Sequence, residues 1–220
     1  MDSVQLRRYA IPPLLTVTGV LALYGVVSPH RYAKLGALLL VGGTAAVAAG
    51  VILAERYRLH LQNLVEEKSY RITLRSVLAA TFLTGFVLLI GLYAAAAVIA
   101  VVTAAWGYEP VSFQIFADVM GRLALLLDLP VMQLIGGYTA VAAAMGVGFW
   151  MLFPYLPVED EAVGGPAAFV AVWAYLLGAA AILAPVPATA PASLVVDAAV
   201  AAVWGHVFAA AYKDVERYVP

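Results

Sequence analysis

The stretch that decides the fold is SVLAATFLTGFVLLIGLYAAAAVIAVVTAAW, residues Ser76–Trp106, which contains no charged side chain. A helix needs about 20 mainly apolar residues to cross a bilayer core about 30 Å thick, because each residue adds about 1.5 Å along the axis. This stretch is longer than that requirement. It therefore predicts a transmembrane helix that tilts within the bilayer or projects from it.

The rest of the chain has the same character. Of its 220 residues, 65% are apolar and 11% are charged, the net charge is −1 and cysteine is absent. Soluble domains are roughly 45–50% apolar and about 25% charged, so this chain lacks the polar residues needed to cover a water-exposed surface. The composition excludes a disordered chain, a nucleic-acid-binding protein and a disulfide scaffold. We expect a protein of the cell membrane, in contact with the lipid bilayer.

Five further segments are apolar enough to cross the membrane, although the last of them also carries Asp197 and His206. They are Ala10–Val27, Leu35–Ala54, Val131–Phe153, Pro166–Leu183 and Ser193–Tyr212. In the first, Pro12 and Pro13 suit the first turn of a helix, where the backbone N–H groups have no partner in any case. We expect an all-α, multi-pass bundle of about six spans, which forms a single integral membrane domain over residues 1–220.

The positions of lysine and arginine predict the orientation, because cytoplasmic loops are enriched in both. With six spans and a cytoplasmic N-terminus, nine of the 12 cations lie on the cytoplasmic side and three on the outer side. The cytoplasmic ones are Arg7, Arg8, Arg56, Arg58, Lys68, Arg71, Arg75, Lys213 and Arg217, and the outer ones are Arg31, Lys34 and Arg122. Both termini are therefore predicted to be cytoplasmic. The loop Val158–Gly165 contains no cation, so the C-terminal half is less well determined.

The connection Glu55–Arg75 is predicted to continue the second span into the cytoplasm before the chain turns back. Its cations Arg56, Arg58, Arg71 and Arg75 suit contacts with lipid phosphates or with a cytoplasmic subunit. Two interpretations remain open for this segment. It is either a docking surface for a partner or a solvated hairpin with a basic collar.

A second connection, 112–129, is predicted to be an amphipathic helix on the outer side. Its apolar stripe consists of Phe113, Phe116, Met120, Leu123 and Leu127, and Asp118 and Arg122 form a favourable pair four residues apart on another face. Such a helix lies flat in the membrane interface, packs over the bundle as a lid, or enters the bilayer as a re-entrant segment. The sequence does not decide between these positions.

Small residues recur every four positions in two spans, which predicts close helix–helix packing there. The two stripes are Gly42, Ala46 and Gly50 in the second span and Gly136, Ala140, Ala144 and Gly148 in the fourth. Aromatic residues near span ends are expected at the membrane–water interface. They are Tyr24, Tyr57, Trp106, Tyr108, Trp150, Tyr155 and Tyr212.

Asp197 is the carboxylate that falls squarely within an apolar segment. An ionisable residue in a span suggests a functional site, and Asp197 shares a helix face with Ala201, Gly205 and Ala209. It is also only about 6 Å from the predicted start of its helix, so a helix cap or an interfacial anchor is the competing interpretation. Tyr93 and Tyr138 also lie deep within spans, where they either line a cavity or bond to a neighbouring carbonyl. His206 is expected to be a hydrogen-bonded packing residue.

The sequence carries no complete motif for enzymatic chemistry. Glu66, Glu67 and Arg71 resemble the EExxxR string of the CAAX-processing type of intramembrane protease, but the two histidine-containing motifs of that family are missing. The sequence also contains no G-x-S-x-G, no H-E-x-x-H and no phosphate-binding glycine loop. Three scattered histidines and no cysteine exclude an ordinary zinc site or a multi-histidine haem site. We therefore expect no enzyme activity, no cofactor and no metal.

Two functions are compatible with these features. The first is a small permease-like or transporter membrane subunit, which couples to a cytoplasmic partner through residues 55–75. The alternative is a membrane scaffold or assembly factor without transport activity, which packs against the helices of other membrane proteins. The sequence does not indicate an oligomeric state.

Overall fold

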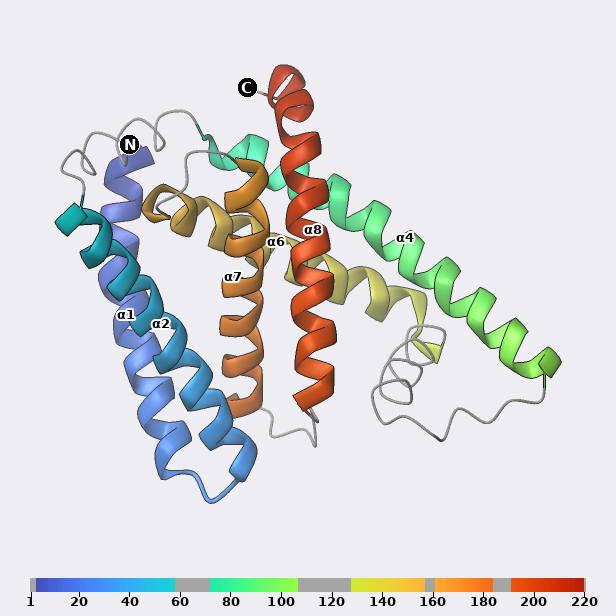
Figure 1. Cartoon of the computed structure of the whole chain (residues 1–220), viewed down its shortest axis with the longest axis horizontal. Coiled ribbons are helices and arrows are strands. Elements are labelled where there is room, and N and C mark those ends of the chain that lie inside the picture. Colours follow the sequence, from blue (N-terminus) through green and yellow to red (C-terminus); the bar gives the residue numbers. More distant parts are fainter. Residues whose placement is uncertain (1–2, 58–71, 107–127, 157–160, 184–190, 220) are drawn as a thin grey trace.

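The computed structural model describes residues 3–57, 72–106, 128–156, 161–183 and 191–219. All regular structure in these ranges is helical (Figure 1). The helices are α1 (Ser3–Val27), α2 (Arg31–Tyr57), α4 (Leu74–Trp106), α6 (Val131–Leu152), the 3₁₀ turn η1 (Phe153–Tyr155), α7 (Glu161–Leu183) and α8 (Pro191–Tyr218). This confirms the predicted all-α class.

Five of these helices contain segments long and apolar enough to cross a membrane. The segments are Tyr9–Val27, Leu74–Trp106, Val131–Tyr155, Gly164–Leu183 and Leu194–Tyr218. The remaining predicted span, Leu35–Ala54, lies within α2. The chain is thus a multi-pass helical membrane protein.

Three helices begin or end well away from the predicted limits. α1 starts at Ser3, so Pro12 and Pro13 lie inside it and not in its first turn. The φ angle that proline fixes is helical, and only two hydrogen bonds are missing; both prolines remain close to the start of the apolar segment at Tyr9. α7 begins five residues before Pro166, and α8 continues to Tyr218 through polar residues that form helices well.

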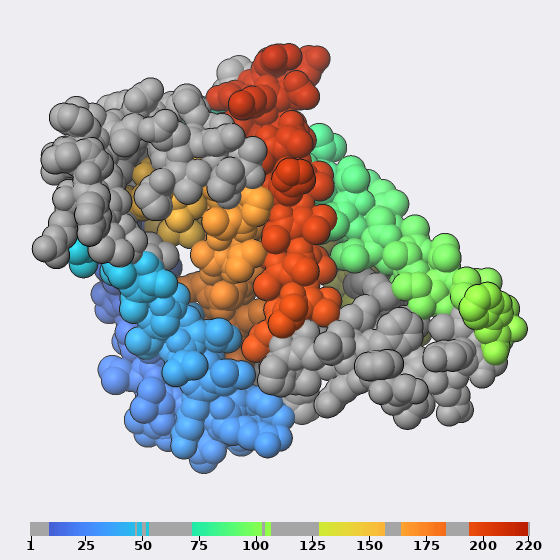
Figure 2. Space-filling view, in the orientation of Figure 1, coloured from blue at the N-terminus to red at the C-terminus, as the bar shows by residue number. Residues whose placement is uncertain are grey.

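α7 occupies the middle of the bundle (Figure 1). On one side it packs against α2, which in turn packs against α1; on the other side it packs against α8, α6 and η1. α4 lies across α6 and α8, and its C-terminal half extends beyond the bundle (Figures 1 and 2). The two chain ends lie at the same end of the bundle (Figure 1).

Among the described residues, two separate clusters form the interior. The larger one, the aromatic core, is built from α4, α6, α7 and α8 around the fully buried Phe149, Phe153, Phe169 and Phe208. The smaller one, the hairpin contact, joins α1 and α2 to α7 through Ala37, Leu40 and Ile182. Large aromatic side chains therefore hold one part of the molecule together, and mainly aliphatic side chains form the other contact.

Glycines allow the helices around α7 to approach closely. A Cβ atom added to Gly36 would lie 2.5 Å from the Gly178 carbonyl oxygen, and one on Gly205 would lie 2.6 Å from the Gly165 carbonyl oxygen. These two pairs set the α2–α7 and α7–α8 contacts. The predicted packing stripes agree with the structure only in part. Gly42 and Gly136 have open space where a Cβ would be, so for these two residues the prediction of close packing within the chain is wrong. Gly148, at the other end of the second stripe, does pack closely, because a Cβ there would lie 2.6 Å from Val172 Cγ1 of α7.

The aromatic residues near the span ends differ in their exposure. Tyr24 and Trp106 are 63% and 80% exposed near helix ends. Trp150 and Tyr212, by contrast, belong to the aromatic core and are 3% exposed. Their position near the end of a span does not reveal that they face the bundle interior.

Candidate functional site

The inner face of α8 carries the predicted site residue Asp197. The residues of this face are Asp197, Ala201, Trp204, Phe208 and Tyr212, which follow at steps of three or four, and every one is buried. Asp197 is 6% exposed, and its predicted companions Gly205 and Ala209 are buried as well. The structure therefore places this carboxylate on the interior face of its helix.

Two turns further along α8, polar side chains of α8 and α4 meet beside Gly85 of α4. The indole Nε1 of Trp204 donates a hydrogen bond to Thr84 Oγ1 at 3.2 Å. A Cβ on Gly85 would lie 2.4 Å from the Trp204 ring and 3.1 Å from the Tyr138 ring. Because residue 85 has no side chain, α4 leaves room for both aromatic rings, one from α8 and one from α6.

Tyr138 uses its hydroxyl group within the protein. The hydroxyl donates to the carbonyl oxygen of Phe82, and the ring packs edge-to-face on Phe82 with 6.0 Å between centroids. This agrees with the interpretation in which a buried tyrosine bonds to a neighbouring carbonyl. Tyr93 lies two to three turns beyond, on the projecting part of α4, and is 40% exposed. The two tyrosines therefore belong to different environments.

A second group of hydroxyls joins α4 to α8 near the end of the bundle where the chain terminates. Ser76 is fully buried; its Oγ lies 3.1 Å from Tyr212 Oη and 2.7 Å from Thr73 Oγ1. Thr81 and Thr84 are also buried, and their hydroxyl groups donate hydrogen bonds to the backbone carbonyl oxygens four residues earlier. α4 thus presents a row of buried hydroxyls to α6 and α8, which the sequence analysis missed because serine and threonine are common in apolar spans.

Trp173 of α7 adds a further polar group. Its Nε1 is buried, and it has no hydrogen-bond partner among the residues that the structure describes. The side chain packs against the aromatic core.

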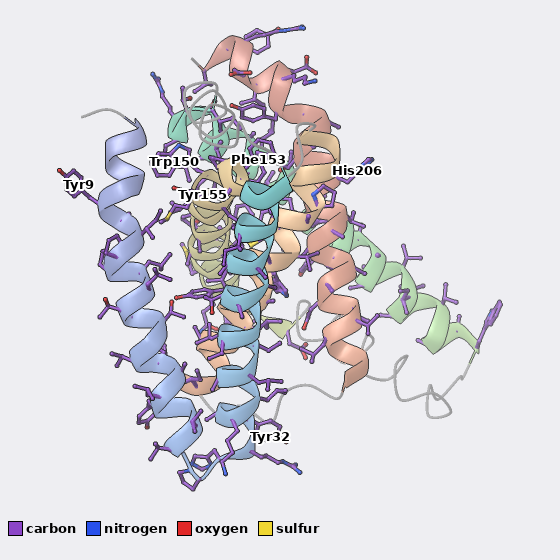
Figure 3. The ribbon with its side chains drawn as sticks, turned by 60° about the vertical axis from the view of Figure 1, so that its left-hand side comes forward. Tyr9, Tyr32, Trp150, Phe153, Tyr155 and His206 are labelled. Carbon is purple, nitrogen blue, oxygen red and sulfur yellow. The ribbon has the colours of Figure 1, made fainter. Side chains whose placement is uncertain are left out.

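His206 differs from its expectation, because it is exposed on the outer face of α8 (Figure 3). His206 follows Trp204 by two residues, which corresponds to a rotation of about 200° around the helix axis. A residue at that position points away from the aromatic core. The prediction of a packing role is therefore wrong.

The basic site residues are described only in part. Arg56 falls in the last turn of α2, and Arg75 is an exposed residue in the first turn of α4. Arg58 and Arg71, like most of the connection 55–75, lie outside the described residues, as does the expected amphipathic helix up to residue 127. Within the described ranges, no group of three or more histidine, aspartate or glutamate side chains is placed to bind a metal ion.

Comparisons with known proteins add no relative to this picture. No protein-family model matches the chain, no curated protein is similar to it, and no solved structure matches its fold.

Proposed function

We propose that the chain is a small permease-like membrane component with an ion or proton site at Asp197. The observation that carries this proposal is the burial of a carboxylate, 6% exposed, on the inner face of a helix with transmembrane character. Ionisable groups are costly in a membrane interior, and those that occur there are usually part of a transport or proton pathway.

The surroundings of Asp197 support the same proposal. Trp204 and Thr84 lie on the two sides of the α4–α8 contact, about 10 Å along α8 from Asp197. The buried hydroxyls of Ser76 and Tyr212 lie further along the same contact. An ion or proton that enters at the end of the bundle where the C-terminus lies first passes the hydroxyls of Ser76 and Tyr212. It then passes Thr84 and Trp204 before it reaches Asp197.

Reconstitution into liposomes tests the proposal. With a pH-sensitive dye trapped inside and a membrane potential imposed, we expect the wild-type protein to pass protons and Asp197→Asn to lose that flux. The matched control is Asp214→Asn on the same helix, where the carboxylate is 72% exposed and 3.5 Å from Arg217. Equal flux in Asp197→Asn and the control, with both variants folded, would contradict the proposal.

A specific observation favours the alternative of a membrane scaffold. The far part of α4 exposes large apolar side chains; Val98, Val101 and Trp106 are 62%, 69% and 80% exposed. Such a surface suits the helices of another membrane protein as well as lipid. Purification of the intact protein in mild detergent separates the two functions. A stoichiometric ATPase subunit supports the permease, whereas a membrane-protein partner that crosslinks to the α4 surface supports the scaffold.

A further inference from the structure

The turn between α1 and α2 carries three basic residues, His30, Arg31 and Lys34, and all three are exposed. The turn lies at the end of the bundle opposite to the chain termini, with Tyr32 beside it at the foot of the molecule (Figures 1 and 3). Arg31 and Lys34 are three residues apart, so their Cβ atoms lie about 5–6 Å from each other on one face of α2. We name His30, Arg31 and Lys34 the basic turn.

The described segments that adjoin the basic turn contain no carboxylate to balance this charge. No aspartate or glutamate occurs from Ser3 to Ala54, that is, throughout the described part of α1 and nearly all of α2. Ile182, near the end of α7, is the side chain that approaches Gly25 and Gly36 beside the turn. From Ala162 to Val196 the sequence again contains no acidic residue. A counter-ion for the basic turn therefore has to come from outside these segments.

The side chain of Arg31 is held in a defined position. Its guanidinium carbon lies 4.9 Å from the centroid of the Tyr32 ring, and its Nη2 donates to the Tyr32 hydroxyl at 3.0 Å. Ordering a long side chain before binding reduces the entropy that is lost when it binds a ligand. Guanidinium groups also bind phosphate oxygens in a bidentate geometry, which makes arginine suited to this anion.

Next to the basic turn, the same face of α2 is apolar and uncovered. Leu38 and Val41 are 69% and 52% exposed, and they follow Lys34 at steps of four and three residues. A ligand that matches this face has an anionic group at one end and a hydrocarbon chain that extends from it toward the bilayer centre. A phospholipid has this shape and charge distribution.

We propose that the basic turn binds the phosphate of an anionic phospholipid, whose acyl chain lies along Leu38 and Val41. The site goes beyond the permease function, because it lies on α2 and does not involve Asp197. It also accounts for cations on the side of the protein that the charge bias assigns to the outside. Lysine and arginine are disfavoured there for threading reasons, so a binding role explains their presence in a cluster.

The test measures lipid preference in nanodiscs made of equal parts phosphatidylcholine and phosphatidylglycerol. After release from the nanodisc, native mass spectrometry counts the lipids that remain bound. We expect wild-type protein to retain phosphatidylglycerol, and the double variant Arg31→Gln, Lys34→Gln to lose that preference by roughly ten- to thirtyfold, since each cation near a membrane surface contributes about fivefold or slightly less.

Two controls test which cations cause the lipid preference and whether the bound anion is a lipid or free phosphate. The double variant Lys213→Gln, Arg217→Gln removes the same charge from exposed residues at the opposite end of the bundle, and it should keep the wild-type preference. Inorganic phosphate at millimolar concentration should not displace the lipid, because it lacks the acyl chain. The proposal is overturned if the two double variants lose the preference equally, if neither loses it, or if free phosphate displaces the lipid.

Discussion

The aromatic core and the hairpin contact meet on the same helix, α7, yet they are built in different ways. In the aromatic core, Phe149 stacks on Phe153 at 5.0 Å and packs against Phe208 at 4.6 Å between ring centroids. The hairpin contact has three small or medium apolar residues and one hydrogen bond between side chains, Thr18 Oγ1 to Tyr175 Oη at 2.8 Å. Lipid is as apolar as a protein interior, so both contacts depend on packing and not on removal of apolar surface from water. The aromatic core depends on the large contact area between its side chains. The hairpin contact depends instead on the missing side chains of Gly36 and Gly178, which let α2 and α7 approach closely.

The largest effect is expected from a cavity in the aromatic core. Phe149→Ala removes a fully buried ring that contacts Phe153, Phe169 and Phe208. We expect a loss of about 3–5 kcal/mol in the free energy of unfolding, measured by steric trapping in bicelles. Val147→Ala on the outward side of the same helix, where the residue is 38% exposed, is the control and should change stability little. Comparable losses for the two variants would show that the core is not packed as described.

The next effect concerns the helix contact beside the core. A Cβ in Gly205→Ala would lie 2.6 Å from the Gly165 carbonyl oxygen and 2.7 Å from the Pro166 Cα. These are backbone atoms that move only with their helices, so we expect a loss of about 1–3 kcal/mol. The same substitution at Gly42, where nothing lies within 4 Å, should be neutral or stabilise by about 0.5–1 kcal/mol through helix propensity. Thermal unfolding in detergent is sufficient to rank the two.

A smaller and local effect is expected in the hairpin contact. Gly36→Ala meets the Gly178 carbonyl oxygen at 2.5 Å, so α2 has to move away from α7. Because the aromatic core does not depend on α2, we expect the α1–α2 hairpin to separate by a few tenths of an ångström or more while the core unfolds at its normal temperature. Spin labels on α2 and α7 report this distance, and the absence of native cysteine makes the labelling specific. Cooperative loss of both regions would mean that the two contacts are one unit.

The smallest effect separates two tryptophans of the core region. Trp204→Phe removes the hydrogen bond to Thr84 Oγ1, and we expect a loss of about 0.5–1.5 kcal/mol. Trp173→Phe removes a buried donor that has no acceptor in the described part of the chain, so its loss should be smaller, or the variant should be more stable. Unfolding measured side by side in the same detergent tests this order. A reversed order would show that Trp173 has an essential acceptor.

The positions of the helices were predictable, because twenty apolar residues in a row have few alternatives in a chain so poor in charge. Ser76–Trp106 and Val131–Phe153 agree with α4 and α6 within two residues. The ends of α7 and α8 were less predictable. Glu161 and Arg217 are polar and lie outside the apolar segments, but they continue their helices all the same.

The faces of the helices were much less predictable than their positions. Gly42 and Gly205 look alike in sequence, each in an apolar helix with small residues nearby, but only Gly205 meets another backbone. In a soluble protein the polar residues mark the outer face, whereas here valine and leucine cover the outside as well. Asp197 is the exception. It shares a helix face with the small residues Ala201, Gly205 and Ala209, and this face is buried in the bundle.

The central position of α7 has a consequence for how the protein is made. Its two glycine contacts lie 13 residues apart, at Gly165 and Gly178, on roughly opposite faces of the helix. One joins α7 to α8, which is synthesised next, and the other joins it to α2, which is synthesised much earlier. Helices insert into the membrane one by one before they associate. The helices α1 and α2 therefore remain in the bilayer without α7 until most of the chain has been translated. During that interval, lipid or an insertion factor has to cover their exposed glycine faces.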